Sequence, residues 1–378
     1  MSPSRSCDFA VIGGGIAGAS AAHALQARGP TVLLERESVP GYHTTGRSAA
    51  FVVESYGSAV VQRLTSGGRS FLEKPPEGFS DHPLVEPCPV IWIARPDQTQ
   101  RLDSAQQRWR NADTSIQALE IAEAERICPV LRPGYAARAL IEPGALSIDV
   151  AGLLDAFLRG FRARGGSVET RAPVRSIQRS GSGWEVHAGE LVLHAAVVVN
   201  AAGAWCDAVA ALAGARPLGM RPLRRTAITF DPPAGCDPRS WPCVIDADEE
   251  FYFKPEGRRI LASPCDETPS DPCDAIPDDY GVALAAERVE RATTMKIKHI
   301  RSSWAGLRTF SPDRSPVIGM DPERPGFFWL AGQGGFGIMT SPAASQAAAS
   351  LIVDGRLPAE LASLGLTSEQ LSPARFAR

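Results

Sequence analysis

The hydrophobic and polar positions at the start of the chain follow the order strand, turn, helix, strand. Residues 9–12 are a continuous apolar run, residues 13–18 contain four glycines, and an alanine-rich stretch to about residue 28 favours a helix. A second apolar run at residues 31–34 ends at Glu35. This alternation predicts a fold of the α/β class.

The glycine turn has the spacing of a dinucleotide-binding fingerprint, with Gly13, Gly15 and Gly18 at its key positions. Such glycines let the backbone approach a pyrophosphate, and the following helix offers free N–H groups and a positive dipole to that anion. Glu35 stands where these folds place a carboxylate for ribose hydroxyls. The pattern predicts a dinucleotide site without distinguishing NAD from FAD.

Two later segments repeat the change from an apolar strand to small residues and then a helix. The run at 195–199 leads into residues 200–205, and the run at 327–331 leads into the glycine-rich residues 332–337 and a helical pattern over about 341–353. A helix dipole can stabilise negative charge at the edge of a reduced flavin ring. The use of both ends of the chain favours a flavin over a nicotinamide cofactor.

Composition narrows the ligand to a small molecule. The 378 residues carry 39 Lys and Arg against 42 Asp and Glu, without the long basic run that nucleic acid would require. The eight cysteines form no C-x-x-C pair and no zinc spacing, so we expect reduced thiols and no metal site. Neither a signal-peptide pattern nor an apolar run of membrane-spanning length occurs, which predicts a soluble cytoplasmic protein and leaves a loose membrane association open.

Six segments together resemble the FAD-dependent D-amino-acid oxidase superfamily, and among its members the bacterial D-arginine dehydrogenase type. They are VIGGGIAGAS, LLERE, GYHTTGRSAA, VVNAAGAWCDAVA, WAGLRTFSPDRSPVIG and AGQGGFGIMTSPA. The resemblance implies a two-domain α/β (α+β) architecture: a Rossmann-like FAD-binding domain of the glutathione-reductase type and a second, mainly antiparallel-sheet substrate domain. The expected partners are a D-amino acid and an electron acceptor, either a quinone or O2.

The resemblance also implies a discontinuous domain organisation. We expect the FAD-binding domain to comprise residues 1–82, 144–205 and 308–365. The substrate domain would take residues 83–143 and 206–307, and residues 366–378 would form a loose tail. The apolar period of residues 150–161 after Asp149 predicts a capped helix on the FAD-domain sheet.

The cofactor implied is noncovalent FAD, because residues 332–337 contain neither Cys nor His, although His43 and Cys206 keep covalent attachment open. By the resemblance, the ADP half would be held by Gly13, Gly15, Gly18, Glu35 and Arg36. The complete set of cofactor residues implied by the resemblance is Gly13, Gly15, Ile16, Ala17, Gly18, Glu35, Arg36, Thr44, Thr45, Gly46, Arg47, Ser48, Ala49, Val174, Ala201, Ala202, Gly203, Trp205, Gly306, Arg308, Gly334, Gly335, Gly337, Ile338, Met339 and Thr340.

Four residues are candidates for the substrate site. A planar guanidinium can anchor a carboxylate bidentately, and Arg308 and Arg225 match the carboxylate-binding arginines of the resemblance. Tyr252 matches a tyrosine that donates to the same carboxylate, and Tyr56 matches one on a mobile loop over the site. Each could instead be an ordinary ion-pair or core residue.

The pocket residues depart from the D-arginine dehydrogenase pattern. Val90 stands where members that prefer cationic substrates carry an acid, and Phe51, Val53 and Met339 replace polar residues; Gly306 completes the predicted pocket. A guanidinium buried there without a counter-charge would cost several kcal/mol. We therefore expect uncharged, largely apolar side chains to be preferred over D-Arg and D-Lys, unless the side chain of Glu54 faces the site.

The predicted reaction is oxidative deamination of D-amino acids in amino-acid catabolism. The Cα hydride passes to the flavin, and the imino acid hydrolyses to a 2-oxo acid and ammonia. A secondary-amine oxidase of the glycine or sarcosine type is the alternative within the same fold. A catalytically inactive FAD-binding assembly protein is a third possibility, although such a protein has no need of a carboxylate clamp.

Overall fold

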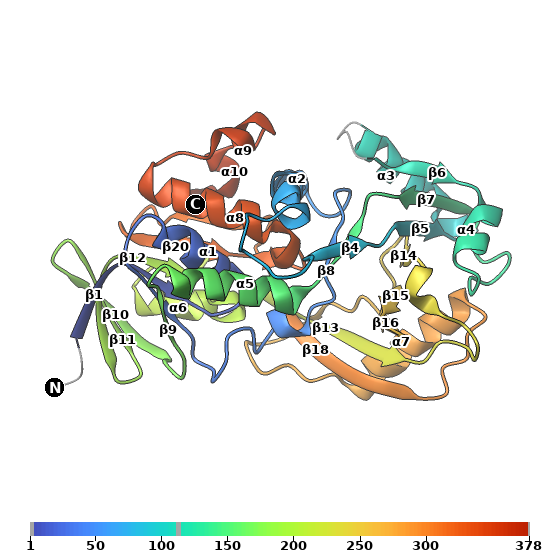
Figure 1. The fold of residues 1–378 in the computed structure, drawn as a ribbon, viewed down its shortest axis with the longest axis horizontal. Helices are drawn as coiled ribbons and strands as arrows, with labels where there is room; N and C mark the ends of the chain where they lie inside the picture. Colours follow the sequence, from blue (N-terminus) through green and yellow to red (C-terminus); the bar gives the residue numbers. More distant parts are fainter. Residues whose placement is uncertain (1–3, 111–114, 377–378) are drawn as a thin grey trace.

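The computed structural model describes residues 4–110 and 115–376, and its strands within these ranges gather mainly into two large sheets (Figure 1). The first sheet has the order β10-β11-β12-β1-β2-β9, with β20 paired to β12 and β19 to β20. Its strands are β1 (Ser4–Ile12), β2 (Thr31–Leu34), β9 (Ser167–Glu169), β10 (Val174–Ser180), β11 (Gly183–Ala188), β12 (Leu191–Asn200), β19 (Val317–Met320) and β20 (Phe327–Ala331). The pairs that join β20, β12, β1, β2 and β9 are parallel, so their carboxyl ends lie at one edge.

Both faces of the central parallel part of this sheet are buried, which explains the continuous apolar runs of β2, β20 and the second half of β1. On β1, Phe9 and Val11 belong to a core shared with four helices, whereas Ala10 and Ile12 pack on the opposite face with β10, β11 and α6. The helices on the first face are α1 (Ile16–Gln26), α2 (Ala59–Glu73), α5 (Val150–Ala163) and α8 (Gly337–Val353), and α6 on the second face is Cys206–Leu212.

The second sheet is antiparallel except for the pairing of β14 with β5. Its order is β21-β18-β13-β16-β15-β14-β5-β7-β6, with β17 paired to β13. The strands are β5 (Val90–Ala94), β6 (Gln117–Leu119), β7 (Arg138–Glu142), β13 (Arg221–Phe230), β14 (Cys243–Asp246), β15 (Tyr252–Glu256), β16 (Arg259–Ser263), β17 (Thr268–Pro269), β18 (Ile300–Phe310) and β21 (Gln333–Gly334). Helices α4 (Ile121–Ile127) and α7 (Asp279–Ala292) cover one face, and α3 (Thr99–Arg110) packs on the other.

The predicted two-domain α/β architecture with an antiparallel second sheet is thus confirmed. The exact domain boundaries stay predictions. A small third sheet of β3 (Phe51–Val52), β8 (Leu146–Ile148) and β4 (Val85–Pro87) joins segments that the prediction assigned to different domains. Short 3-10 turns complete the described chain: η1 (Thr45–Arg47), η2 (Pro96–Gln98), η3 (Gly203–Trp205), η4 (Pro238–Ser240) and η5 (Pro373–Phe376).

The helix predicted after Asp149 is present as α5, and the Asp149 side chain accepts a hydrogen bond from the Gly152 N–H, as an N-cap should. Helix α8 begins at Gly337, four residues before the predicted start, and includes Pro342 near its N-terminal end. None of the helices in residues 4–110 and 115–376 is long and apolar enough to cross a membrane.

The C-terminal residues are packed, so the prediction of a loose tail from residue 366 is wrong for the described part. After α9 (Ala359–Ser363), helix α10 (Ser368–Leu371) places Leu371 fully inside the core of α1, α2, α5 and α8. The Arg375 guanidinium donates to the Asp313 carboxylate and to the Ser315 carbonyl, each at 2.8 Å. Apolar burial and this ion pair hold the segment in place.

Candidate active site

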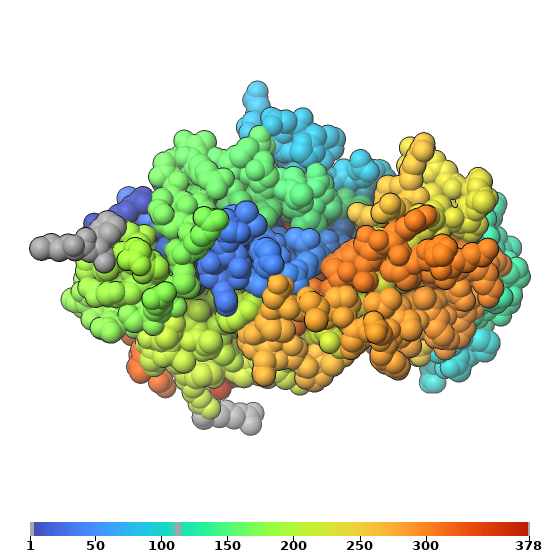
Figure 2. Space-filling model, turned by 90° about the horizontal axis from the view of Figure 1, so that it is seen from below, coloured from blue at the N-terminus to red at the C-terminus, as the bar shows by residue number. Residues whose placement is uncertain are grey.

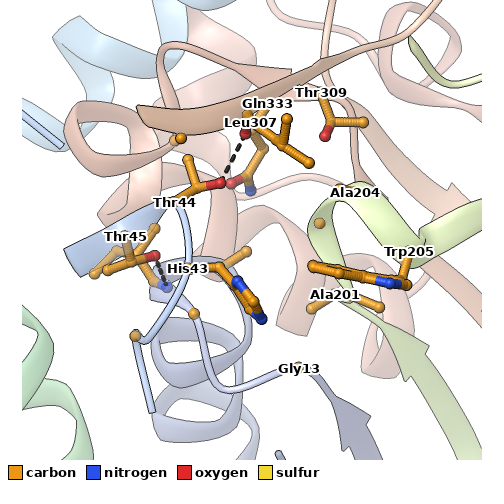
Figure 3. A pocket seen from close by; sticks show the side chains of 18 of the residues that line it. Gly13, His43, Thr44, Thr45, Ala201, Ala204, Trp205, Leu307, Thr309 and Gln333 are labelled. Atoms are coloured by element: carbon orange, nitrogen blue, oxygen red, sulfur yellow. Dashed lines mark hydrogen bonds between the residues drawn. The ribbon is translucent and has the colours of Figure 1, made fainter. Parts of the chain in front are cut away.

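A cavity of about 520 Å³ opens at the carboxyl ends of the parallel strands, and Figure 3 shows part of its lining. Ile12, Leu34 and Ala331 border it where β1, β2 and β20 end, and Ala201 follows β12. The crevice beyond the carboxyl ends of the strands is the usual ligand site of an open α/β sheet.

The glycine turn after β1 is required by close backbone contacts. Gly13 has φ +108°, and a Cβ there would lie 2.4 Å from the Ala201 carbonyl oxygen. A Cβ on Gly18 would lie 1.8 Å from the Gly13 carbonyl oxygen. Gly13 therefore permits the turn, and Gly18 lets α1 start close to the strand without itself bordering the cavity.

Glu35 borders the cavity at the end of β2 and is 7% exposed. Its carboxylate accepts hydrogen bonds from the Gly14 N–H at 2.7 Å and the Glu37 N–H at 2.8 Å. These bonds hold the carboxylate beside the glycine turn. Ribose hydroxyls of a dinucleotide bound there would donate to the same carboxylate.

Residues 41–48 form a loop between α1 and the second sheet. The Thr45 hydroxyl oxygen accepts from the Ile16 N–H at 3.0 Å, and the Thr44 hydroxyl donates to the Leu307 carbonyl at 2.7 Å (Figure 3). Gly46 donates its N–H to the Gly41 carbonyl at 2.8 Å and does not border the cavity. The polar loop thus ties one wall of the cavity to α1 and to β18 of the second sheet.

An exposed contact closes the same loop from outside, where the blue N-terminal part of the chain meets the orange part in Figure 2. Arg47 forms an ion pair with Asp274 and donates to the carbonyls of Ala275 at 2.7 Å and Ala305 at 3.1 Å. The Tyr42 hydroxyl donates to Asp274 at 3.1 Å. We call Tyr42, Arg47 and Asp274 the loop latch.

The polar lining of the cavity fits a large polar ligand. Four residues that border it each have a buried side-chain atom without a hydrogen-bond partner among the described residues: His43 Nδ1, Arg225 Nη1, Thr309 Oγ1 and Gln333 Nε2. A buried polar atom left unpaired costs about 1–3 kcal/mol. The starts of α1 and α8 also border the cavity. Apart from the Ile16 N–H, which donates to Thr45, their first backbone N–H groups have no partner within the helix and are available to an anion.

Most of the predicted cofactor residues border this cavity. The exceptions are Gly18, Gly46, Met339 and Thr340. Met339 is on the face of α8 that packs in the core. The Thr340 hydroxyl donates to the carbonyl of Phe336, the N-cap of the same helix, at 2.9 Å. Gln333 borders the cavity and was missed, although it lies inside a motif that predicted the cavity. His43 also borders the cavity, where the sequence suggested it only as a possible covalent attachment point.

The predicted carboxylate-binding residues all border the same cavity. Arg225 on β13 is paired with Gly306 on β18, two residues before Arg308, and both arginines border the cavity with Tyr252. Glu267 lies 3.4 Å from Arg225 and 2.7 Å from Arg314. Within residues 4–110 and 115–376, Arg308 has no hydrogen bond or ion pair.

The two predicted tyrosines differ in position. Burial raises the pKa of Tyr252 to about 12 against the lowering effect of Arg308 and Arg225, so its phenol stays protonated and can donate. Tyr56 does not border the strand-end cavity. Burial, followed by the charge of Glu249, raises the pKa of Tyr56, and its hydroxyl donates to Glu249 at 2.9 Å.

A second cavity of about 950 Å³ lies on the other side of Arg308, which borders both cavities. We call it the aromatic chamber, because its walls include the rings of Tyr56, Trp92, Trp109, Phe310 and Phe336.

Of the predicted pocket residues, only Gly306 borders either of these two cavities. Phe51, Val53 and Val90 pack together in the core cluster that also contains Trp92. Residues 90 and 92 of a strand point to the same face. The larger Trp92, two residues along, reaches the chamber wall, and Val90 is fully buried behind it.

The acidic residues near this cluster are already engaged. Glu54 bonds Ser66 at 2.7 Å and Arg69 at 2.9 Å, so its carboxylate is held by α2. Glu142 on β7 is paired with Val90 and is 1% exposed. Burial raises the pKa of Glu142, whose carboxylate accepts from the Glu54 N–H and the Ser55 hydroxyl. Glu142 was missed because only strand pairing brings it beside Val90.

The strand-end cavity, the two helix starts and the arginine pair define a dinucleotide-dependent oxidoreductase. Residues 8–351 match the model of the family described as FAD dependent oxidoreductase (DAO), and the chain belongs to that family. FAD is therefore its cofactor, as predicted. The nearer likeness to the D-arginine dehydrogenase type stays a prediction.

Curated relatives share low identity over long stretches. Hydrogen cyanide synthase subunit HcnC of Pseudomonas aeruginosa is 27% identical over 60% of this chain and 53% of its own length. Human mitochondrial sarcosine dehydrogenase is 25% identical over 94% of this chain and 41% of its own length. The chain thus spans about half the length of these relatives. Glycine oxidase of Geobacillus kaustophilus is 23% identical over 95% of this chain and 96% of its own length.

Solved structures support the fold. L-proline dehydrogenase from P. horikoshii superposes with a TM-score of 0.87 and 20% identity, covering 100% of this chain and 99% of that one. Glycine oxidase from Geobacillus kaustophilus gives a TM-score of 0.83 and 22% identity, covering 94% and 96%.

Proposed function

We propose that this protein oxidises α-amino acids at Cα, with D-enantiomers as substrates. The observation that carries the proposal is the unpartnered guanidinium of Arg308, which borders the FAD cavity beside Arg225 and Tyr252. Such an arrangement of N–H and O–H donors on the wall of one cavity suits a carboxylate. The D preference and the deamination outcome are supported by the motif resemblance.

The charges around Arg308 support an anionic substrate group. Burial by itself would raise the pKa of Glu267, but hydrogen bonding to Arg314 and the nearby guanidinium charges hold it below its ordinary value. The ionised Glu267 is shared between Arg225 and Arg314. A substrate carboxylate would supply the charge that Arg308 lacks and a partner for the free Arg225 Nη1.

The chain's residues would act mainly by binding and orientation. Arg308 and Arg225 would fix the carboxylate, and the protonated Tyr252 would donate a third hydrogen bond to it. Bound FAD supplies the acceptor for the hydride that leaves Cα. The substrate amine must lose a proton first, and the imino acid formed takes up water outside the oxidation step to give a 2-oxo acid and ammonia.

We further propose that uncharged side chains are preferred over D-Arg and D-Lys. Glu54 is held by Arg69, and Glu142 is occupied by Ser55 and the Glu54 N–H. Neither carboxylate is free to pair with a buried cation, and Glu249 already accepts a hydrogen bond from the Tyr56 hydroxyl. An unpaired buried cation costs several kcal/mol.

Oxidation of a secondary or unsubstituted small amino acid is the second candidate. It is favoured by the names of the relatives, which include glycine oxidase and sarcosine dehydrogenase. The same carboxylate site would serve it.

Anaerobic stopped-flow measurement of flavin bleaching tests these proposals with D- and L-amino acids, glycine, sarcosine and proline. We expect D-amino acids with uncharged side chains to bleach the flavin fastest. Preference for glycine or sarcosine would support the second candidate. If no amino acid bleaches a flavin that dithionite reduces, the function is not amino-acid oxidation. An oxygen electrode with and without an added quinone identifies the electron acceptor.

A further inference from the structure

The aromatic chamber is lined by a connected series of rings. The centroid of Tyr56 lies 5.1 Å from that of Phe336 and 6.0 Å from that of Trp92, and Trp92 lies 5.4 Å from Trp109. Phe336 in turn lies 6.2 Å from Phe310. Aromatic faces and edges at such spacings favour planar ligands with aromatic rings.

The chamber adjoins the carboxylate site. Arg308 borders both cavities, and the charges of Arg308 and Arg225 act on the Tyr56 hydroxyl. A substrate whose carboxylate is held by Arg308 can therefore extend its side chain toward Tyr56 and Trp92. About 950 Å³ is far more than an aliphatic side chain fills.

One wall residue has an unused polar group. Trp92 is 3% exposed, and its indole Nε1–H has no acceptor among the described residues. Buried indole N–H groups usually find a partner. A ligand that carries a hydrogen-bond acceptor would satisfy this donor, whereas a purely apolar side chain would leave it unpaired.

Some charged groups of the chamber wall are paired with a group of opposite charge. Arg101 contacts Asp248 at 2.9 Å, and Arg314 contacts Glu267 at 2.7 Å. Glu249 has the neutral Tyr56 hydroxyl as its described partner, and Arg63 has the neutral Gln370 side chain at 3.4 Å. The wall that a substrate side chain would meet therefore combines aromatic rings with polar side chains, and Glu249 is its carboxylate without a charged partner among the described residues.

We infer that the aromatic chamber binds the substrate side chain, and that the preferred substrates are amino acids with an aromatic ring that carries a hydrogen-bond acceptor, such as a hydroxyphenyl group. The inference rests on the proposed function, since Arg308 must hold the carboxylate for the side chain to reach Trp92.

The test compares flavin reduction by tyrosine, phenylalanine and leucine, each as the active enantiomer, in wild type and Trp92→Phe. The wild type should prefer both aromatic substrates to leucine by about tenfold. Trp92→Phe should lower kcat/KM for tyrosine by about fivefold, as expected for one neutral hydrogen bond, and change phenylalanine by less than twofold. Trp241→Phe is the matched control, because Trp241 is 7% exposed in the separate core of α4 and α7.

A binding measurement separates this inference from the proposed function and does not need the variant to fold. Wild-type holoprotein should bind 3-(4-hydroxyphenyl)propionate more tightly than 3-phenylpropionate, measured by perturbation of the flavin spectrum. Tighter binding of the hydroxyphenyl acid without oxidation of any amino acid would support the chamber and contradict the function. Oxidation with no preference for aromatic side chains, or a best substrate of arginine or lysine held by Glu249, would overturn the inference.

Discussion

Arg308 lies directly against Gly335: a Cβ added to Gly335 would stand 2.7 Å from the guanidinium Nη1 and 2.9 Å from its Cζ. The backbone of Gly335 is not in the left-handed region, so only this contact resists a side chain. Gly335→Ala should displace Arg308 with little cost to the fold, lowering kcat/KM for the substrate by about tenfold. Stopped-flow flavin reduction measures the effect.

Gly144→Ala is the control for Gly335→Ala, because its added Cβ would lie an ordinary 3.6 Å from an arginine, Arg69. The effect of Gly335→Ala should also disappear in an Arg308→Met background. Equal losses with and without Arg308 would show that Gly335 acts elsewhere.

Removal of either guanidinium should weaken the carboxylate site. Arg308→Met is expected to raise KM and slow flavin reduction, with a loss of about 2–5 kcal/mol in transition-state stabilisation, the range for truncating a buried charge partner. Arg225→Met should give a loss of the same sign and leave Glu267 paired with Arg314 alone. FAD content, read from the absorbance ratio, should stay unchanged. Wild-type kinetics in Arg308→Met would exclude Arg308 from the site.

The FAD should be noncovalent. Cys206 is fully buried and does not border the cavity, and the residues 332–337 contain neither Cys nor His. Acid precipitation should leave the yellow colour in the supernatant. Colour that stays with the pellet would contradict the prediction, and its loss in His43→Asn would identify His43, which borders the cavity, as the attachment site.

Opening the loop latch should speed FAD release. Asp274→Asn removes the ion pair with Arg47 and weakens the bond from Tyr42, which loosens the wall formed by residues 41–48. The Asp274 side chain is 53% exposed, so solvent screens the pair and the rate should rise only about twofold to fivefold. The rise in FAD fluorescence after dilution measures it. Asp271→Asn, in the same loop between β17 and α7, should release FAD at the wild-type rate.

Acid should destabilise the protein through His23. Burial among Phe79 and Phe157, followed by the charge of Arg164, lowers the pKa of His23 to about 4. The unfolded chain therefore binds more protons than the folded chain between the ordinary value near 6.5 and about 4. The free energy of unfolding is therefore unaffected by His23 above pH 6.5. It falls as the pH is lowered toward 4, by up to about 1.4 kcal/mol per pH unit.

The melting temperature at pH 7 and pH 5 tests this prediction. His23→Gln should show a smaller drop between the two pH values than wild type, whatever its absolute stability. His194→Gln should behave as wild type, because the His194 side chain is 41% exposed. An unchanged drop in His23→Gln would assign the acid sensitivity to other groups.

The cofactor site could be predicted from sequence because its residues are local to motifs. The turn at Gly13 and Gly18 needs glycine for reasons of backbone contact, and Glu35 follows one βα unit later, so spacing alone locates them. Gln333 was missed, and His43 was named only as a possible attachment point, because their side chains turn inward only once the loops are folded.

The substrate side could be predicted only in part. Arg225, Arg308 and Tyr252 border the cavity as expected. Which of two residues on the same strand face reaches a cavity depends on packing across sheets, so Val90 was predicted where Trp92 lies. The pairing of Val90 with Glu142, 52 positions apart in the printed sequence, has no local signal.

The separation of the two cavities has a consequence for evolution and engineering. Trp92, Leu102 and Trp109 line the aromatic chamber from β5 and α3, and the 90–110 segment contributes no residue to the FAD cavity. Substitutions on this segment can change which molecules the enzyme accepts without weakening its hold on the cofactor. Substitutions at residues 92, 102, 105 and 109 should therefore alter the substrate range of variants that still bind FAD, provided that side-chain volume is kept, because all four residues are at most 7% exposed.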